Sequence, residues 1–181
     1  MNFTSDWVSH NEKNFMMCMG HLGFTRGHFL EIGSFEGRST CWFLQNGLAD
    51  DGTMTCIDTF TPYWYKEGDL LERFQVNVRE AKKKYQVVST LAMNSPQALA
   101  QLIQQKQEYD FIYIDGDHSP AGVLTDAVMA WGLLRRDGVM LFDDYEYDKE
   151  PTKIGIDAFL KGFEGQYEIV LRNYQLAVKK K

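Results

Sequence analysis

Short apolar runs alternate along this chain with longer amphipathic segments. A run of four to six mostly apolar residues is typical of a buried strand, and apolar residues at helical spacing indicate a helix with one buried face. Because strands and helices alternate, we expect an α/β fold: a mostly parallel, seven-stranded sheet with an antiparallel strand at its C-terminal end and helices on both faces. The expected strands are 29–32, 53–58, 86–91, 110–115, 139–142, 167–171 and 176–179, and the expected helices follow Ser39 and cover 67–85, 97–105, a segment from Ser119 or Pro120, and 152–163.

The length and composition favour a single domain spanning residues 1–181. At 181 residues and 44% hydrophobic content, the chain is long enough to bury a full core and too apolar to be disordered. Residues 1–27 carry aromatic and methionine side chains at loosely helical spacing, so we expect an N-terminal helical segment packed on a core formed by 28–181.

Charge and cysteine usage limit the partners and the compartment. The formal net charge of −6 argues against non-specific binding to nucleic acid, and the lysine runs 82–84 and 179–181 are interpreted as solvated ends. The chain has no apolar run of about 20 residues, so no membrane span is expected. Cys18, Cys41 and Cys56 are odd in number and lie among apolar neighbours, which indicates reduced core thiols in a cytoplasmic protein. The oligomeric state is left open, with a homo-oligomer as one option.

The segment 29–40 has the pattern of a strand, a tight turn and a helix start. Gly33 and Gly37 allow positive φ and close backbone approach, and Ser39 or Thr40 can cap the helix that follows. A helix start after a strand presents unpaired N–H groups, which often bind a nucleotide-like ligand. The alternative interpretation is an ordinary β-α turn without a ligand.

The residues in this turn argue against a dinucleotide. The G-x-G-x-x-G fingerprint needs a glycine where this chain has Phe35, and Glu31 and Glu36 would repel a pyrophosphate. A ligand with positive charge fits better, and S-adenosylmethionine carries a sulfonium and an amino group. Here the sequence resembles the class I methyltransferases, whose Rossmann-like fold carries an acidic residue followed by a Gly-x-x-x-Gly turn. The resemblance implies cofactor contacts from this segment, at Glu31, Gly33, Ser34, Gly37, Ser39 and Thr40.

Further cofactor contacts are expected at the ends of the second and third strands. Asp58 stands where α/β nucleotide-binding folds place the acid that binds ribose hydroxyls, although it could simply cap a turn. Thr59 opens the aromatic segment 59–65, with Trp64 and Tyr65, which we interpret as a pocket wall. The methyltransferase resemblance assigns adenine contacts to Asn94 and Ser95, while capping of the next helix would also explain Ser95.

Four carboxylates follow the fourth and fifth strands. Parallel strands present their carboxyl ends on one edge, so Asp115, Asp117, Asp143 and Asp144 are expected to converge beside the Gly33 turn. Their mutual repulsion is relieved most simply by a divalent cation, and oxygen ligands suit Mg²⁺ or Ca²⁺ better than zinc. Such a cation would lower the pKa of an acceptor hydroxyl, and Asp117 or His118 would remove its proton. The alternative is that these acids are solvated turn residues.

The motifs at 114–119 and 141–145 resemble those of the metal-dependent, macrocin-type sugar O-methyltransferases. That resemblance runs from residue 29 to 145 and implies that Asp115, Asp143 and Asp144 hold the metal, with Asp115 also bordering the cofactor, and that Asp117 is the base. This chain departs from the pattern in being shorter and in having His118 directly after Asp117. The leading hypothesis is methylation of a hydroxyl on a small polar or sugar-like acceptor, with N- or C-methylation left open. A nicotinamide-dependent oxidoreductase and a non-catalytic nucleotide-binding module are the alternatives.

Overall fold

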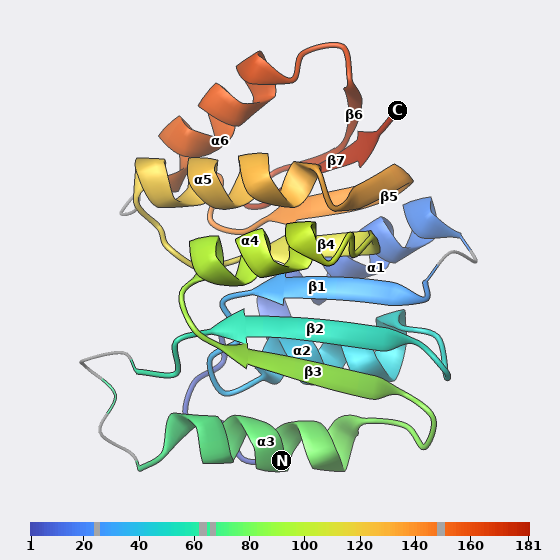
Figure 1. Cartoon of the computed structure of the whole chain (residues 1–181), viewed down its shortest axis with the longest axis vertical. Coiled ribbons are helices and arrows are strands. Elements are labelled where there is room, and N and C mark those ends of the chain that lie inside the picture. The colour runs from blue at the N-terminus through green and yellow to red at the C-terminus, as the bar shows by residue number, and fades with distance from the viewer. Residues whose placement is uncertain (24–25, 62–64, 66–67, 148–150) are drawn as a thin grey trace.

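The computed structural model describes residues 1–23, 26–61, 65, 68–147 and 151–181. Strands and helices alternate along most of the chain, as the apolar pattern predicts (Figure 1). In chain order the elements are η1 (Ser9–Asn11), α1 (Glu12–Leu22), β1 (His28–Ile32), α2 (Arg38–Trp42), η2 (Phe43–Gly47), β2 (Thr53–Asp58), α3 (Leu70–Ala81), β3 (Val87–Ala92), α4 (Ser95–Gln104), β4 (Tyr109–Ile114), α5 (Pro120–Trp131), β5 (Leu134–Phe142), α6 (Thr152–Gly162), β6 (Tyr167–Arg172) and β7 (Leu176–Lys180).

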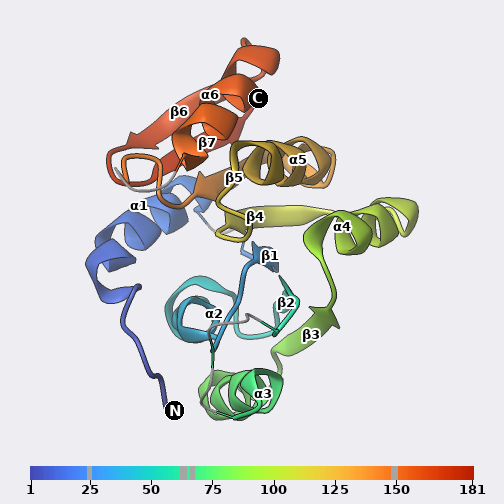
Figure 2. The same ribbon diagram turned by 90° about the vertical axis from the view of Figure 1, so that its left-hand side faces the viewer.

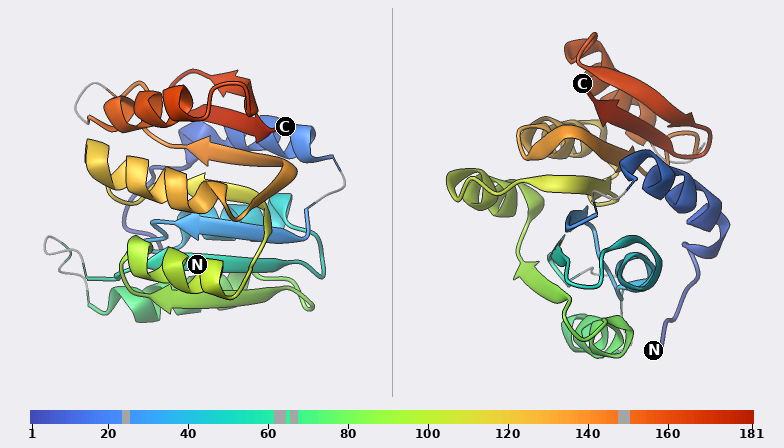
Figure 3. Two further views of the ribbon diagram at one scale, coloured as in Figure 1. Left: turned by 45° about the horizontal axis from the view of Figure 1, so that its top comes forward. Right: turned by 90° about the vertical axis from the view of Figure 1, so that its right-hand side faces the viewer.

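The strands form a seven-stranded sheet in the order β3-β2-β1-β4-β5-β7-β6. The first five strands run parallel to one another, whereas β7 runs antiparallel to both β5 and β6. The expected mostly parallel sheet with an antiparallel C-terminal strand is therefore confirmed, and the C-terminal hairpin lies at the edge of the sheet beside β5 (Figure 3).

Helices cover both faces of the sheet because the central strands are apolar on both sides. In β1, Phe29 packs into the core under α1, α2 and α3, whereas Leu30 packs into the core under α4, α5 and α6. In β4, Phe111 packs into the first of these cores and Ile112 into the second. This alternation follows from the two-residue period of a strand. Figure 2 looks along the sheet and shows the two helical layers on either side of it.

The turn after β1 lies at the point where the sheet order reverses, between β2 and β4. Gly33 has φ of +88°, and a Cβ placed on it would lie 1.8 Å from the carbonyl oxygen of Asp115. A side chain at this position would therefore collide with the main chain at the end of β4. The predicted need for glycine at this turn is confirmed, and the close approach brings the β1 turn against the acidic loop after β4.

Two helix caps differ from the sequence-based prediction. Gly37 is the N-cap of α2, with φ of +81°, so the prediction of a cap by Ser39 or Thr40 is wrong. Their hydroxyls instead donate to the buried carboxylate of Glu31. At α4 the prediction of a Ser95 cap is also wrong, because the side chain of Asn94 accepts the hydrogen bond from the Gln97 amide at 3.1 Å. At α2 the buried Glu31 carboxylate engages the two hydroxyls, whereas at α4 the cap is Asn94, one residue earlier, which is an equally favoured capping residue.

Element boundaries shift by a few residues from those predicted. The helix predicted over 67–85 is described over Leu70–Ala81, where the Asp69 side chain caps it by accepting from the Glu72 amide at 2.9 Å. Strand β5 begins at Leu134, earlier than predicted, and passes through Asp137, which has φ of +62°. Cys18, Cys41 and Cys56 are buried free thiols, as expected. Within the described segments, none of the helices has the length and apolar character that crossing a bilayer requires.

Candidate active site

A cavity of about 1460 Å³ opens at the carboxyl edge of the sheet. Its wall includes residues that follow each of the five parallel strands, together with Trp7 and His10 from the N-terminal segment. Parallel strands direct their following loops to one edge, so the cavity collects residues that are far apart in the sequence. The predicted site residues that border it are Gly33, Asp58, Thr59, Asn94, Ser95, Asp115, Asp117, His118, Asp143 and Asp144.

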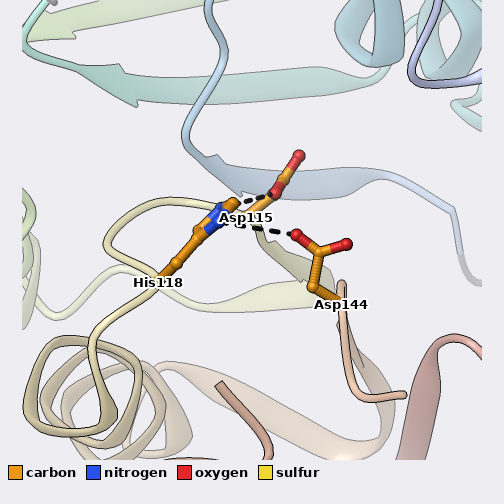
Figure 4. A group of neighbouring side chains, drawn as sticks. All are labelled: Asp115, His118 and Asp144. Atoms are coloured by element: carbon orange, nitrogen blue, oxygen red, sulfur yellow. Dashed lines mark ion pairs between the residues drawn. The ribbon is translucent and has the colours of Figure 1, made fainter. Parts of the chain in front are cut away.

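Asp115, His118 and Asp144 form a compact cluster in this cavity. The Nε2 atom of His118 lies 3.3 Å from an Asp115 carboxylate oxygen, and its Nδ1 atom lies 3.5 Å from an Asp144 carboxylate oxygen (Figure 4). One ligand atom from each of the three residues lies within 4.8 Å of the other two. Two carboxylates and an imidazole at this spacing form a donor set that fits a divalent metal ion.

Asp143 is held differently from its neighbour Asp144. Its Oδ2 atom accepts a hydrogen bond of 2.6 Å from the Tyr113 hydroxyl, and its Oδ1 atom accepts from Gln175 at 2.9 Å, from Asn11 at 3.4 Å and from the Asp144 amide at 3.0 Å. Both carboxylate oxygens are thus engaged within the protein. The predicted ligand set contained Asp143, whereas the cluster that the geometry assembles contains His118 in its place.

The conformation of Asp144 points its side chain toward the cluster. The residue has φ of +53°, a left-handed conformation that aspartate tolerates better than most residues. The Thr152 hydroxyl donates to its carbonyl oxygen at 2.6 Å, and the Tyr174 hydroxyl donates to its carboxylate. Because Thr152 starts α6 and Tyr174 belongs to the C-terminal hairpin, the end of the chain helps to fix this carboxylate.

The carboxylates raise one another's pKa. Desolvation, followed by the charge of Asp143, raises the pKa of Asp115 to about 8, while His118 opposes the shift. Burial also raises the pKa of Asp143, which the hydrogen bond from Tyr113 partly offsets. A bound cation would favour the ionised form of both groups.

Asp117 lies at the same edge but is more exposed than the cluster. Its Oδ1 atom accepts a hydrogen bond of 2.8 Å from the Ser119 amide, which fixes the carboxylate at the start of α5. The structure places Asp117 on the cavity wall beside Gly122, where a Cβ would lie 2.2 Å from the Asp117 side chain. Gly122 therefore leaves room for this carboxylate.

Much of the predicted β1 turn lies behind the cavity rather than on its wall. Glu31 is completely buried and accepts hydrogen bonds from Ser39, at 2.6 Å, and from Thr40. Burial raises its pKa. Glu36 is also buried, and the Thr4 amide and hydroxyl donate to it at 2.7 and 2.8 Å. The two carboxylates that were expected to select a cationic ligand therefore hold the turn together, while Ser34 and Gly37 shape its backbone.

Asp58 combines a fixed position with access to the cavity. Its two carboxylate oxygens accept hydrogen bonds from the Phe35 amide at 2.8 Å and from the Phe60 amide at 2.6 Å. The first bond links the end of β2 to the glycine turn. Phe35 has φ of +47° and stands where a dinucleotide fingerprint has glycine. A carboxylate oxygen that already accepts one bond keeps a lone pair for another, so Asp58 can still bind a ligand hydroxyl.

Aromatic side chains border the cavity near the turn. Trp7 and Phe35, which both line it, pack with ring centroids 5.2 Å apart, and Tyr65 packs edge-on against Phe35 at 5.5 Å. Residues 62–64 of the expected pocket wall, which include Trp64, lie outside the described residues.

Sequence reasoning missed several residues of the site. The partners of Asp143 were not predicted, because Asn11 and Gln175 lie far from it in the sequence. Asp126 was also missed, although an acid among the buried positions of an otherwise apolar helix, between Val123 and Ala127, was a visible signal.

A family model described as a methyltransferase domain matches residues 30–145, which is more than half of the chain. The chain belongs to this family. The expectation of a class I S-adenosylmethionine-dependent methyltransferase, with a Rossmann-like fold, is thereby confirmed. The match favours a methyltransferase over the nicotinamide-dependent alternative. No curated protein sequence matches this methyltransferase significantly.

Solved structures of methyltransferases share the fold. An O-methyltransferase from Bacillus cereus in complex with SAH is 20% identical, with a TM-score of 0.69 over 99% of this chain and 84% of that chain. CalS11, a TDP-rhamnose 3'-O-methyltransferase of calicheamicin biosynthesis, is 17% identical, with a TM-score of 0.62 over 94% of this chain and 80% of that one. The SAH-bound Podospora anserina methyltransferase PaMTH1 is 18% identical, with a TM-score of 0.63 over 93% and 78%.

Proposed function

We propose that this methyltransferase transfers the methyl group of S-adenosylmethionine to a hydroxyl oxygen of a small polar or sugar-like acceptor, with the help of a divalent cation. The observation that carries the proposal is the cluster of Asp115, His118 and Asp144, whose ligand atoms lie within 4.8 Å of one another in the cavity. Two structural neighbours support methylation on oxygen, because both are O-methyltransferases, and CalS11, which acts on TDP-rhamnose, supports a sugar-like acceptor.

The cofactor is proposed to lie across the ends of β1, β2 and β3. Asp58 is placed to accept hydrogen bonds from the ribose hydroxyls, and Thr59, Asn94 and Ser95 border the cavity beyond it. Gly33 lets the β1 turn approach the loop after β4, so the backbone there can lie against the amino-acid part of the ligand. Glu31, with Ser39 and Thr40, keeps this turn in place.

The cation is proposed to be held by Asp115, Asp144 and His118. When bound there, it would lower the pKa of the acceptor hydroxyl by Lewis-acid polarisation. Asp143 would position the site from behind, because Tyr113, Gln175 and Asn11 already hold its carboxylate. Oxygen-rich sites suit Mg²⁺, and an imidazole ligand also admits Mn²⁺.

Asp117 is proposed to remove the acceptor proton. It borders the cavity, its Oδ1 atom is fixed by the Ser119 amide, and it stands two residues after Asp115 on the same loop. His118 is the weaker candidate, because its ring lies between the carboxylates of Asp115 and Asp144. Trp7 and Phe35 would exclude water from one side of the acceptor. A cytoplasmic location and a second subunit that completes the acceptor site are part of the same proposal.

Chelation separates the roles of the cation and the cofactor. Treatment with EDTA is expected to reduce methyl transfer from labelled S-adenosylmethionine to background, and Mg²⁺ or Mn²⁺ should restore it. Binding of S-adenosylhomocysteine, measured by calorimetry, should change by no more than about twofold, because the cofactor-binding residues lie mostly at other strand ends. The assay uses a panel of small hydroxyl compounds that includes nucleotide-linked sugars. Transfer that persists in excess chelator would contradict metal dependence.

The identity of the base is tested with Asp117→Asn. The amide keeps the size of the side chain but cannot take a proton, so kcat is expected to fall by about 10²- to 10⁴-fold. Cofactor affinity should stay unchanged. An unchanged kcat would exclude Asp117 and return the role to His118, which His118→Gln then tests.

A further inference from the structure

Asp126 is a buried carboxylate that the methyl-transfer chemistry does not use. It belongs to the buried side of α5, with Val123, Ala127 and Ala130, and is 1% exposed. Neither of its carboxylate oxygens has a hydrogen-bond partner among the residues that the structure describes. A buried carboxylate without a partner is costly, so proteins rarely keep one without a use.

Asp126 borders the cavity on the side of α5, outside the cluster of Asp115, His118 and Asp144. A Cβ on Gly116 would lie 3.4 Å from its Oδ2 atom, so the carboxylate lies beneath the loop after β4. The Ser95 side chain lowers the pKa of Asp126, so Asp126 also lies near the loop after β3. In the sheet order, β3 and β2 lie on one side of β1, and β4 and β5 lie on the other. Asp126 therefore lies between the loops after β3 and β4, and a ligand whose ribose binds Asp58 would extend one end toward Asp144 and the other into the space that Ser95 and Asp126 border.

The chemistry of the cofactor determines what this second end is. The sulfonium must lie toward the acceptor, so the adenine lies on the opposite side of the ribose. Adenine carries one exocyclic donor, the 6-amino group, and ring nitrogens that only accept. A carboxylate accepts hydrogen bonds and cannot donate when ionised.

We propose that Asp126 accepts a hydrogen bond from the 6-amino group of the cofactor adenine and thereby selects adenine over a 6-oxo purine. The inference rests on the proposed use of S-adenosylmethionine. Burial raises the pKa of Asp126 to about 6, so the Asp126 carboxyl is mostly ionised near neutral pH and can accept a hydrogen bond. The Ser95 hydroxyl opposes this rise and Asp117 adds to it.

Direct binding tests the inference without turnover. Calorimetry compares S-adenosylhomocysteine with S-inosylhomocysteine, in which an oxygen replaces the 6-amino group. The wild-type protein should bind the adenosyl compound at least about 30-fold more tightly, since a site built around a donor rejects an analogue that lacks it. In Asp126→Asn the amide can donate to the 6-oxo group, so the preference should fall to within about threefold or reverse. Asp51→Asn, an exposed substitution outside the cavity, is the matched control and should keep the wild-type ratio.

Thermal melting without ligand shows whether Asp126→Asn still folds. Without cofactor, Asp126→Asn should melt at or above the wild-type temperature, because it removes a buried charge that has no hydrogen-bond partner among the described residues. If the wild type and Asp126→Asn discriminate equally between the two ligands, the adenine contact is refuted and the methyltransferase proposal stands. If the wild type binds neither ligand, both proposals fail. If Asp126→Asn melts lower and binds neither, Asp126 is structural and the inference is overturned.

Discussion

Asp115→Asn is expected to reduce methyl transfer by about 10³-fold, because it removes a charged member of the cluster that would hold the cation. The side chain keeps its size and stays close to His118, so the fold should be retained. Initial rates with saturating S-adenosylmethionine and Mg²⁺ measure the effect. Asp51→Asn, which makes the same chemical change on an exposed turn, should leave the rate unchanged. A rate within about tenfold of wild type would show that Asp115 is not a ligand.

The same carboxylate makes cation affinity depend on pH. In the cation-free protein, burial and Asp143 raise the pKa of Asp115 to about 8, so the group is mostly protonated at pH 6 to 7. A cation needs the ionised form and displaces the proton, so affinity should rise by up to about tenfold per pH unit and level off above pH 8. Calorimetry in buffers of different ionisation enthalpy would count the proton released. A pH-independent affinity would contradict this account.

Gly33→Ala is expected to destabilise the protein by about 3 to 5 kcal/mol and to abolish cofactor binding. The added methyl group would lie 1.8 Å from the carbonyl oxygen of Asp115, and the residue would keep φ of +88°, so the β1 turn and the β4 loop must separate. In a domain of this size such a loss lowers the melting temperature by about 10 °C. Calorimetric melting and binding of S-adenosylhomocysteine measure the two effects.

Gly23→Ala separates backbone strain from collision. Gly23 has φ of +61°, yet a Cβ there meets no atom within 4 Å. With ψ of −119°, Gly23 lies outside the left-handed helical region, so this variant should lose the about 1 to 3 kcal/mol expected for a non-glycine residue in a sparsely populated backbone conformation, and it should bind cofactor normally. Equal losses in the two variants would show that the close approach at Gly33 has no special role.

The β1 turn and the two acidic loops could be placed from sequence because they depend on strand pattern. Apolar runs of strand length define the sheet, and parallel strands end at a common edge. Asp58, Asp115, Asp117 and Asp144 therefore had to lie near one another, and all four border the cavity. The family resemblance then supplied the methyltransferase activity, which the domain match supports.

The direction in which each side chain points was decided by the tertiary structure. Glu31 precedes the glycine turn as the motif requires, yet it is turned inward and is held by Ser39 and Thr40. Asp143 and Asp144 are adjacent in sequence, but Tyr113 and Gln175 hold the first, while the second faces His118. Hydrogen-bond partners that lie far away in the chain decide such orientations, and their positions are known only once the core has packed.

The sequence by itself determined the order of strands and helices, the need for glycine at Gly33, and the edge where the acids gather. These features follow from local patterns, namely the period of apolar residues and the geometry of parallel strands. Only the tertiary structure decided that His118 joins Asp115 and Asp144, that Tyr113 holds Asp143, and that Asp126 borders the cavity with no hydrogen-bond partner among the described residues. Packing sets these because a buried polar group takes whichever partner the fold brings within hydrogen-bond distance.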